Sequence, residues 1–524
     1  AEGEPQVKQL SKDLGVDNSA ARRRRTSVRR KREAKGKSRQ GRLTALRLRG
    51  QHRAFRLVQG SILPAAPQGL SPRAMTWVRS VASAPLGRHT LGSVEVVLDL
   101  YSASVRDPTE RVIAEHLVAV LPLLASARRN DATYLDHTWA VTRSRLSHAP
   151  HPWRVVAGPL AALQAYLINL GIDAPSLQAW ITNGEEIPPL NTDGTGGFPV
   201  IQLIQQQISR IRSLKIANQA SGQGAEGGLD WSVHRKLERK LKTQPFKRAA
   251  HRAVWQAAIV TQDKGMSTSC PHCQQPATLP HVLLHCPWWR SRHRIVPAHW
   301  AKLQEAYPYN CLWHRALLPA ALTQANWPDV PLKKHGCLDA TDRINAAGLV
   351  WGTDASGGPS RDCRARLVTW AVVAMTREAH GLEYAGHIQG VLPQGTSVYT
   401  GEAFAIKHLL SITTGCVECT TDCLGVYQTL TKSGKLPSFW QDVAAEIPRL
   451  QLTWVNSHLS QEAFAKKFGS EQLWRRQINQ EADAKCVIPE MVDRARQHAN
   501  KIKRLDQLVL EVSSFLSERT MVLL

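Results

Sequence analysis

The sequence contains no apolar run long enough to cross a membrane. The best candidate, residues 116–127, is too short and includes Pro122, whereas a spanning helix needs about 20 mostly apolar residues. No secretory signal leads the chain, and it begins with Ala1 rather than methionine, so we expect a fragment or a processed piece. These absences predict an intracellular protein without a membrane partner.

Cysteines are ordinary in number, and acidic residues are outnumbered by basic ones. Ten cysteines in 524 residues do not form the dense framework of a small disulfide-stabilised domain, so we expect a reducing compartment with some cysteines on metal. Only 42 Asp and Glu stand against 67 Lys and Arg, which leaves a net charge of +25. Such an excess of positive charge points to nucleic acid as the partner.

The N-terminal segment is the most basic part of the chain. Residues 1–60 hold 18 Lys and Arg against 5 Asp and Glu, with the runs Arg22-Arg23-Arg24-Arg25 and Arg29-Arg30-Lys31-Arg32. We expect a disordered arm that binds phosphate backbones without reading their sequence, because counterion release drives such binding. A nuclear-localisation signal has the same composition. The two roles are compatible, so we expect a nuclear protein.

The rest of the chain divides into segments of different pattern. Residues 61–262 show helical periodicity at 111–127, 158–167 and 200–215 and are expected to be mostly α, with Pro122 kinking or splitting the first helix. The further boundaries are a zinc knuckle at 263–300, a connector at 301–345 without assigned function, an α/β domain at 346–490 and a helical tail at 491–524.

Four carboxylates lie at matching places in the α/β domain. Asp354 and Asp422 each come at the end of an apolar strand, whereas Glu402 and Asp483 lie on predicted helices. Side chains from the ends of several elements can converge at one edge of a sheet, and Mg²⁺ prefers oxygen ligands. A lone Asp is usually a surface charge or a helix cap. The ordered set instead predicts a site for two Mg²⁺ or Mn²⁺ ions that hydrolyses a phosphodiester, with His458 on a loop as a proton shuttle.

The pattern around these residues is β-β-β-α-β-α-α-β-α, which predicts a five-stranded mixed sheet flanked by helices. The expected strands cover residues 349–353, 367–375, 382–389, 417–422 and 450–455, and the expected helices cover 401–410, 424–432 and 439–447. Residues 341–490 contain 14 Lys and Arg and 15 Asp and Glu. This segment is nearly neutral, so we expect affinity for the substrate to come from the basic remainder of the chain.

This order of motifs resembles the type 1 ribonuclease H family, which has Thr-Asp after strand one, Glu on the first helix, Thr-Asp-Ser/Cys, Trp-Val-x-x-His and Asn-x-x-x-Asp. The resemblance covers residues 349–486. It implies a ribonuclease H-like fold and an endonuclease that cleaves the RNA strand of RNA–DNA hybrids, with specificity from 2′-hydroxyl contacts. It also implies catalytic roles for Asp354, Glu402, Asp422, Asp483 and His458. One departure is that residues 459–478 make a longer loop than the family has.

A second set of metal-ligating residues follows the helical segment. Cys270, Cys273, His281 and Cys286 have the spacing C-x2-C-x7-H-x4-C, and three thiolates with one imidazole make a closed tetrahedral site for structural Zn²⁺. The alternative is four unrelated residues that include ordinary buried cysteines. The Trp288-Trp289 pair that follows could stack on bases or pack in the core.

The knuckle resembles the one that follows the reverse transcriptase in non-LTR retrotransposons. Residues 60–262 look like the segment just after the reverse-transcriptase palm, on the basis of Leu63-Pro64-Ala65-Ala66, of Gly158-Pro159-Leu160 with Leu170-Gly171-Ile172, and of residues 248–261. The chain contains no Asp-Asp pair, so the Tyr-x-Asp-Asp signature of the polymerase is absent. The resemblance implies the C-terminal part of a retrotransposon polyprotein that binds the element's RNA and target DNA but holds no polymerase site.

Two hypotheses for the function follow. The first is the hybrid-cleaving endonuclease. The second is a catalytically inactive, nucleic-acid-binding remnant of a retroelement polyprotein, in which the arm and the knuckle bind. The survival of all four carboxylates favours the enzyme, whereas the missing polymerase signature and the long 459–478 segment favour the remnant.

Overall fold

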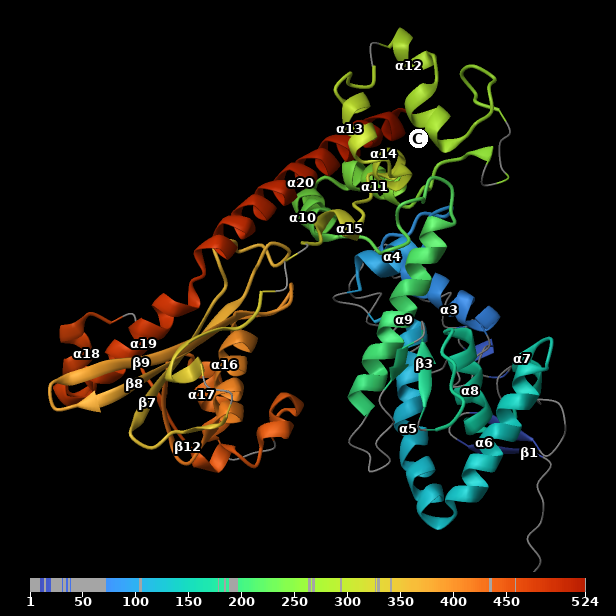
Figure 1. The fold of residues 1–524 in the computed structure, drawn as a ribbon. Coiled ribbons are helices and arrows are strands. Elements are labelled where there is room, and N and C mark those ends of the chain that lie inside the picture. Colours follow the sequence, from blue (N-terminus) through green and yellow to red (C-terminus); the bar gives the residue numbers. More distant parts are fainter. Residues whose placement is uncertain are drawn as a thin grey trace, which may run out of the picture. The chain divides into compact units, whose positions relative to one another are not determined.

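The structure is a computed structural model, drawn in Figure 1. It describes residues 10–13, 16–19, 31, 34–35, 38, 72–102, 106–177, 179–182, 185–187, 197–262, 265, 269–292, 295–325, 327, 330–339, 342–432, 436–457 and 459–523. The chain forms two compact units, of which the first combines residues 1–322 with 508–524 and the second covers 323–507. We describe each unit by itself.

The second unit is built on a mixed sheet of six strands in the order β12-β11-β7-β8-β9-β5. The strands are β5 (Lys333–Gly336), β7 (Leu349–Ser356), β8 (Thr369–Glu378), β9 (Gly381–Val391), β11 (Val417–Thr421) and β12 (Leu450–Trp454). The chain runs antiparallel through β7, β8, β9 and β5, while β11 lies parallel to both β7 and β12. The coarse expectation of an α/β fold is therefore confirmed.

Helices cover both faces of this sheet (Figure 1). A Cβ on Gly401 of α16 (Val398–Ile412) would touch Ala355, whereas a Cβ on Gly352 would touch Ile478 of α19 (Leu473–Cys486). Positions 352 and 355 differ by an odd number, and side chains alternate between faces along a strand. The helices α16 and α19 therefore lie on opposite faces, and each buries an apolar cluster against the sheet.

All five expected strands are present, but the sheet differs from the expectation in two places. The sixth strand, β5, comes from the segment expected to be a connector. It escaped prediction because all four of its residues are exposed and show no apolar alternation. Strand β7 also continues two residues beyond Asp354, so this carboxylate lies inside a strand rather than after it, with Ala355 still paired to Trp370 on β8.

The remaining elements of this unit are short. They are the strands β6 (Ile344–Asn345) and β10 (Thr413–Thr414), the helices α17 (Leu424–Thr431) and α18 (Gln461–Phe468), and the 3-10 helices η6 (Cys337–Asp339), η7 (Ser438–Val443), η8 (Ile447–Arg449) and η9 (Ser470–Gln472). The helix expected at 439–447 is thus replaced by η7 and η8, and Pro448, which directly follows the expected helix, lies at the start of η8. The long segment 459–478 holds α18, which Ser460 caps.

The first unit is mostly helical, as expected. Its helices are α3 (Pro72–Ser83), α4 (Val94–Leu100), α5 (Pro108–Asn130), α6 (Ala132–Ser147), α7 (Pro152–Val155), α8 (Pro159–Asn169), α9 (Gly197–Ala217), α10 (Ser232–Lys240), α11 (Pro245–Trp255), α12 (Trp288–Ser291), α13 (Trp300–Ala306), α14 (Asn310–Arg315) and α15 (Ala320–Thr323), and it also holds the 3-10 helices η2 (Ala84–Leu86) and η3 (Leu241–Thr243). Short hairpins join β1 (Leu10–Asp13) to β2 (Val16–Ser19) and β3 (Trp180–Thr182) to β4 (Glu185–Ile187).

Pro122 was expected to kink or to split helix α5, and the structure contradicts the split. The helix runs unbroken over 23 residues, with Asp107 as its cap and Pro108 in its first turn. Pro122 is exposed, while Ile113, Leu117 and other apolar residues of α5 are buried. Packing of this apolar face outweighs the hydrogen bond that one proline removes.

A buried group of charges ties four elements of the helical unit together. Asp107 is 1% exposed and pairs with Arg79 of α3 at 3.0 Å and with Arg212 of α9 at 3.4 Å. Arg79 also hydrogen-bonds Glu95 of α4, and Arg212 pairs with Asp99 at 3.1 Å. Although burial opposes it, the two guanidinium groups lower the pKa of Asp107. Buried charges persist only when paired in this way.

The last helix, α20 (Pro489–Leu523), is one helix of 35 residues, where one or two were expected. Its first part belongs to the second unit, where Met491 and Ala495 pack with Leu367 and Asp506 accepts from Arg364 at 2.8 Å. Its last part, from Leu508, belongs to the first unit. Among the described residues, none of the helices is long and apolar enough to span a membrane.

Most of the basic arm, residues 1–60, lies outside the described residues, and so does the motif Leu63–Ala66. Strands β1 and β2 are the largest described piece of the arm. Whether the arm binds nucleic acid therefore stays a prediction.

Candidate functional site

Asp354 lies at the centre of the acidic site. It is the sixth residue of β7 and is only 6% exposed. Its Oδ1 accepts a hydrogen bond from the backbone N–H of Ala355 at 2.7 Å, and its Oδ2 lies 3.8 Å from the Cys486 sulfur. The strand therefore holds this carboxylate in one orientation, facing α19.

Glu402 reaches the same place from helix α16. The helix begins after Ser397, whose hydroxyl accepts from the N–H of Thr400 at 3.1 Å, so that Glu402 falls in the second turn. The side chain is 5% exposed, and its Oε2 has no hydrogen-bond partner among the described residues. A buried carboxylate oxygen without a donor is costly, and a bound cation would satisfy it.

Asp422 completes a group of three carboxylates. It follows β11, which runs parallel to β7, so the C-terminal end of β11 points toward the same edge of the sheet as Asp354. The Ser457 hydroxyl donates to its Oδ2 at 2.7 Å, and the Trp454 indole donates to its backbone carbonyl at 2.9 Å. Oxygen atoms of Asp354, Glu402 and Asp422 all lie within 4.8 Å of one another.

Helix α19 contributes the fourth carboxylate and a residue that the sequence analysis did not include. Asp483 is exposed, and the thiol of Cys486 donates to its backbone carbonyl at 3.1 Å. The side chains of Asp483, Cys486 and Asp354 form a second group within 4.8 Å. The spacing of three residues, which puts Asp483 and Cys486 on one helix face, is the only signal that could have identified Cys486.

The two innermost carboxyl groups resist ionisation. For Asp354, burial and then the charge of Asp422 raise the pKa to about 7. For Glu402, burial and then the charge of Asp354 raise the pKa to about 10. The cluster therefore holds protons at neutral pH, and a cation that replaces them would relieve both causes. Perturbed carboxyl groups of this kind gather at functional sites.

Cys486 acts as a donor in this group rather than as a thiolate. Burial and then the charge of Asp354 raise the pKa of its thiol far above the ordinary range. The neutral thiol donates its one hydrogen to the Asp483 carbonyl, its sulfur lies beside Asp354, and hard cations prefer the oxygens that surround it. His458, the expected proton shuttle, lies outside the described residues.

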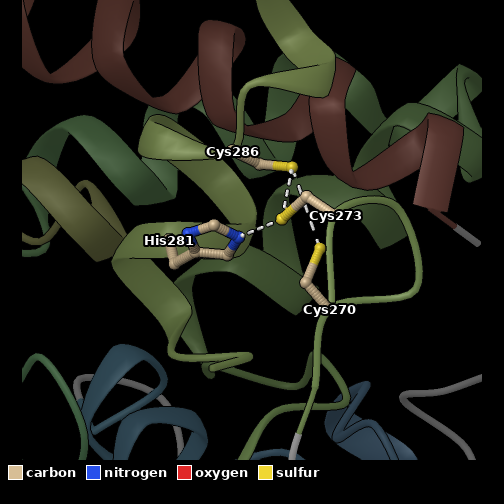
Figure 2. A group of neighbouring side chains, drawn as sticks. All are labelled: Cys270, Cys273, His281 and Cys286. Carbon is tan, nitrogen blue, oxygen red and sulfur yellow. Dashed lines mark hydrogen bonds between the residues drawn. The ribbon is translucent and has the colours of Figure 1, made fainter. Parts of the chain in front are cut away.

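The four expected zinc ligands come together in the helical unit. Figure 2 shows their side chains pointing toward one another. Cys273 Sγ lies 3.7 Å from Cys286 Sγ and 3.1 Å from His281 Nε2, and Cys270 Sγ lies 3.7 Å from Cys286 Sγ. With Zn–S bonds of about 2.3 Å, a tetrahedral site has S–S edges of about 3.8 Å. The sulfur atoms therefore already stand at the spacing that a tetrahedral metal requires.

The local backbone explains how the knuckle forms. Gln274 adopts a left-handed conformation with φ 64° just after Cys273. Although burial opposes it, backbone N–H groups of His272 and Cys273 lower the pKa of the Cys270 thiol. Residues His281–His285 form a π-helical turn in which the Cys286 N–H donates to the His281 carbonyl at 2.8 Å. This wider turn keeps two ligands that are five residues apart together, and such turns are frequent at functional sites.

The C-terminal end of α20 supports the knuckle. Arg519, which is 1% exposed, donates to the carbonyls of Leu283 and Leu284 in the π-helical turn and lies over the ring of Trp289. The Trp289 indole donates to Val282 at 2.8 Å, so this tryptophan is a core residue. Trp288 is half-buried and stacks on His272 with ring centroids 4.1 Å apart.

Compared with models of protein families, with curated proteins and with solved structures, the chain gives no significant match. The two residue groups themselves are therefore the basis for a function.

Proposed function

We propose that this protein is a ribonuclease H-type endonuclease that cleaves the RNA strand of RNA–DNA hybrids, within a retrotransposon-derived protein. The observation that carries the proposal is the convergence of Asp354, Glu402 and Asp422 from two strands and a helix on one place, with Asp483 beside them. The strand order of the mixed sheet and the motifs in sequence order also support a ribonuclease H-like fold.

The acidic group suits hard divalent cations such as Mg²⁺ or Mn²⁺. Two such ions, held by the four carboxylates, would activate the attacking water and stabilise the leaving oxygen. Ser457 orients Asp422 through a 2.7 Å hydrogen bond, and the backbone N–H of Ala355 orients Asp354 through another. His458 is assigned proton transfer to the leaving group on the resemblance alone.

Zn²⁺ is the ion that we assign to Cys270, Cys273, His281 and Cys286. Three sulfurs and one imidazole nitrogen at tetrahedral spacing suit zinc, and a set of four leaves no open position for chemistry. We infer a structural site. We further propose nucleic acid as the partner and the nucleus as the location, on the charge of +25.

The second candidate function is an inactive, nucleic-acid-binding remnant. The absence of an Asp-Asp pair from the chain favours it, because a decayed polyprotein can lose one activity after another. The complete acidic group, with its buried and unsatisfied Glu402 oxygen, favours the enzyme.

The deciding experiment is a cleavage assay on a labelled RNA–DNA hybrid with Mg²⁺, Mn²⁺ or EDTA. Asp422→Asn keeps the side-chain shape and the hydrogen bond with Ser457 but removes a charge, so we expect loss of cleavage with binding preserved. Asp493→Asn is the matched control, since this aspartate is exposed on α20 and pairs with Arg496 on the same helix.

Metal-dependent cutting of the RNA strand that is lost in Asp422→Asn and retained in Asp493→Asn would establish the activity. Cutting that survives in Asp422→Asn would exclude this site. A folded wild-type protein that binds the hybrid without cutting it would support the remnant.

A further inference from the structure

The edge strand β5 places basic residues on the same sheet face as the carboxylates. Lys333 pairs with Gln389 of β9, Gln389 with Ala371 of β8, and Ala371 with Asp354 of β7. Residues opposite one another on neighbouring strands point to the same face. Lys333 therefore extends the row that begins at Asp354, at about 14 Å by the spacing of roughly 4.8 Å between strands.

A second row runs beside the first. His335 pairs with His387, and His387 pairs with Val373, which packs with Ile478 of α19. The rings of His335 and His387 stack with centroids 5.7 Å apart. We call Lys333, His335, His387 and Gln389 the β5 strip. It lies on the face that α19 covers near the carboxylates.

The surroundings of the β5 strip are polar and nearly balanced in charge. The Tyr384 hydroxyl hydrogen-bonds His387 Nδ1, and Lys485 of α19 lies 5.3 Å from the centre of the Tyr384 ring. Lys485 pairs with Glu481 at 3.4 Å, so these two charges offset one another. Lys333 and His335 are both exposed, so a ligand can reach their charged and donor atoms.

We propose that β5 is a substrate-binding strand on which Lys333 and His335 contact backbone phosphates of the RNA–DNA hybrid bound at the carboxylates. This inference rests on the proposed function and extends its site across the sheet. Two features identify the occupant: the first row is continuous with Asp354, and Lys333 in that row carries a positive charge. About 14 Å of duplex carries about eight phosphate charges, which the nearly neutral residues 341–490 would otherwise leave unmatched.

The chain offers a matched control one residue away. Lys334 has the same charge, strand and exposure as Lys333, but it pairs with Ile388, which is buried in the cluster on the α16 face. Burial lowers the pKa of His408 on α16, and the charge of Lys334 lowers it further. The two lysines therefore differ in the sheet face to which they point.

The test measures binding of a fluorescent hybrid to the full-length chain in the Asp422→Asn background, with Mg²⁺ and at several salt concentrations. For Lys333→Ala we expect Kd to rise about eightfold at 0.1 M salt, and the slope of log K against log salt to fall by about 0.9, which is the loss of one phosphate contact. Lys334→Ala should leave both unchanged. The arm contributes equally to both variants.

A cleavage assay of the two variants without Asp422→Asn separates the outcomes. We expect Lys333→Ala to raise KM and to leave kcat unchanged. Equal Kd values for the two lysine variants would overturn the inference and leave the nuclease standing. A wild-type protein that does not cut would overturn the proposed function, while the Kd comparison would still decide whether the β5 strip binds nucleic acid.

Discussion

Binding of a divalent cation to the carboxylate group is predicted to release about two protons at pH 6 and about one at pH 8. With a pKa of about 7, Asp354 is mostly protonated at pH 6 and mostly ionised at pH 8. With a pKa of about 10, Glu402 keeps its proton at both pH values. Carboxylates must lose their protons to bind a metal, so these protons leave when the cation enters. The two pKa values belong to the interacting pair. The proton count is the number of protons that the two carboxyl groups hold together.

The variant Glu402→Gln removes one of these protons without changing the size of the side chain. We expect it to release about one proton at pH 6 and almost none at pH 8. The assay is calorimetric titration of zinc-loaded protein with Mn²⁺ in several buffers at each pH. The slope of the apparent enthalpy against the ionisation enthalpy of the buffer gives the number of protons.

The control is Glu490→Gln, because Glu490 is exposed on α20 and should leave the proton count at the wild-type value. The reasoning would be refuted by equal counts for the wild type and Glu402→Gln. It would also be refuted by heat of binding without proton release at pH 6, because the cation would then bind somewhere other than the buried carboxyl groups.

Three further predictions concern stability and metal content. In EDTA, the free energy of unfolding of the wild type should fall as the pH rises from 5 to 7, because the folded state keeps a proton that the unfolded chain has released. This fall should be steeper than that of Glu402→Gln by about 1.4 kcal/mol per pH unit. Parallel profiles from urea titrations would contradict this. Asp107→Ala should lower the free energy of unfolding by about 3–5 kcal/mol, because two buried arginines lose their shared partner; a loss below 1 kcal/mol in urea titrations would show that the ion group is dispensable. Cys286→Ser should lose zinc, measured by metal analysis, whereas Cys311→Ser, which removes a buried thiol outside the metal group, should retain it; equal zinc content would exclude the knuckle.

Local patterns sufficed to place the strands and the acidic residues. Short apolar segments located β7, β8, β9, β11 and β12 to within a few residues, because strands covered on both faces, such as β7 and β8, bury nearly every side chain. The zinc ligands were also readable, since a tight Cys-x-x-Cys turn and a His-x4-Cys helix each depend on neighbours in sequence. Proline at the start of α8 was likewise a local signal.

Other features depend on partners far away in the chain. Nothing near Cys486 shows that it lies 3.8 Å from Asp354, 132 residues earlier. Strand β5 exists because β9 offers an unpaired edge, and its own residues carry no strand pattern. Pro122 is tolerated in α5 because the buried face of that helix packs in the core, which residues near the proline cannot reveal.

By itself, the sequence determined the class of the second unit, the candidate carboxylates and the candidate zinc ligands. The class of the unit follows from the pattern of apolar residues along the chain. The candidate ligands follow from residue types that can bind a metal and from their spacing in the sequence. Only the tertiary structure decided that three carboxylates lie within 4.8 Å, with pKa values raised for Asp354 and Glu402. It also decided that Lys333 and Lys334 point to opposite faces. Burial and proximity arise from packing between distant segments, and these set the electrostatics of a site.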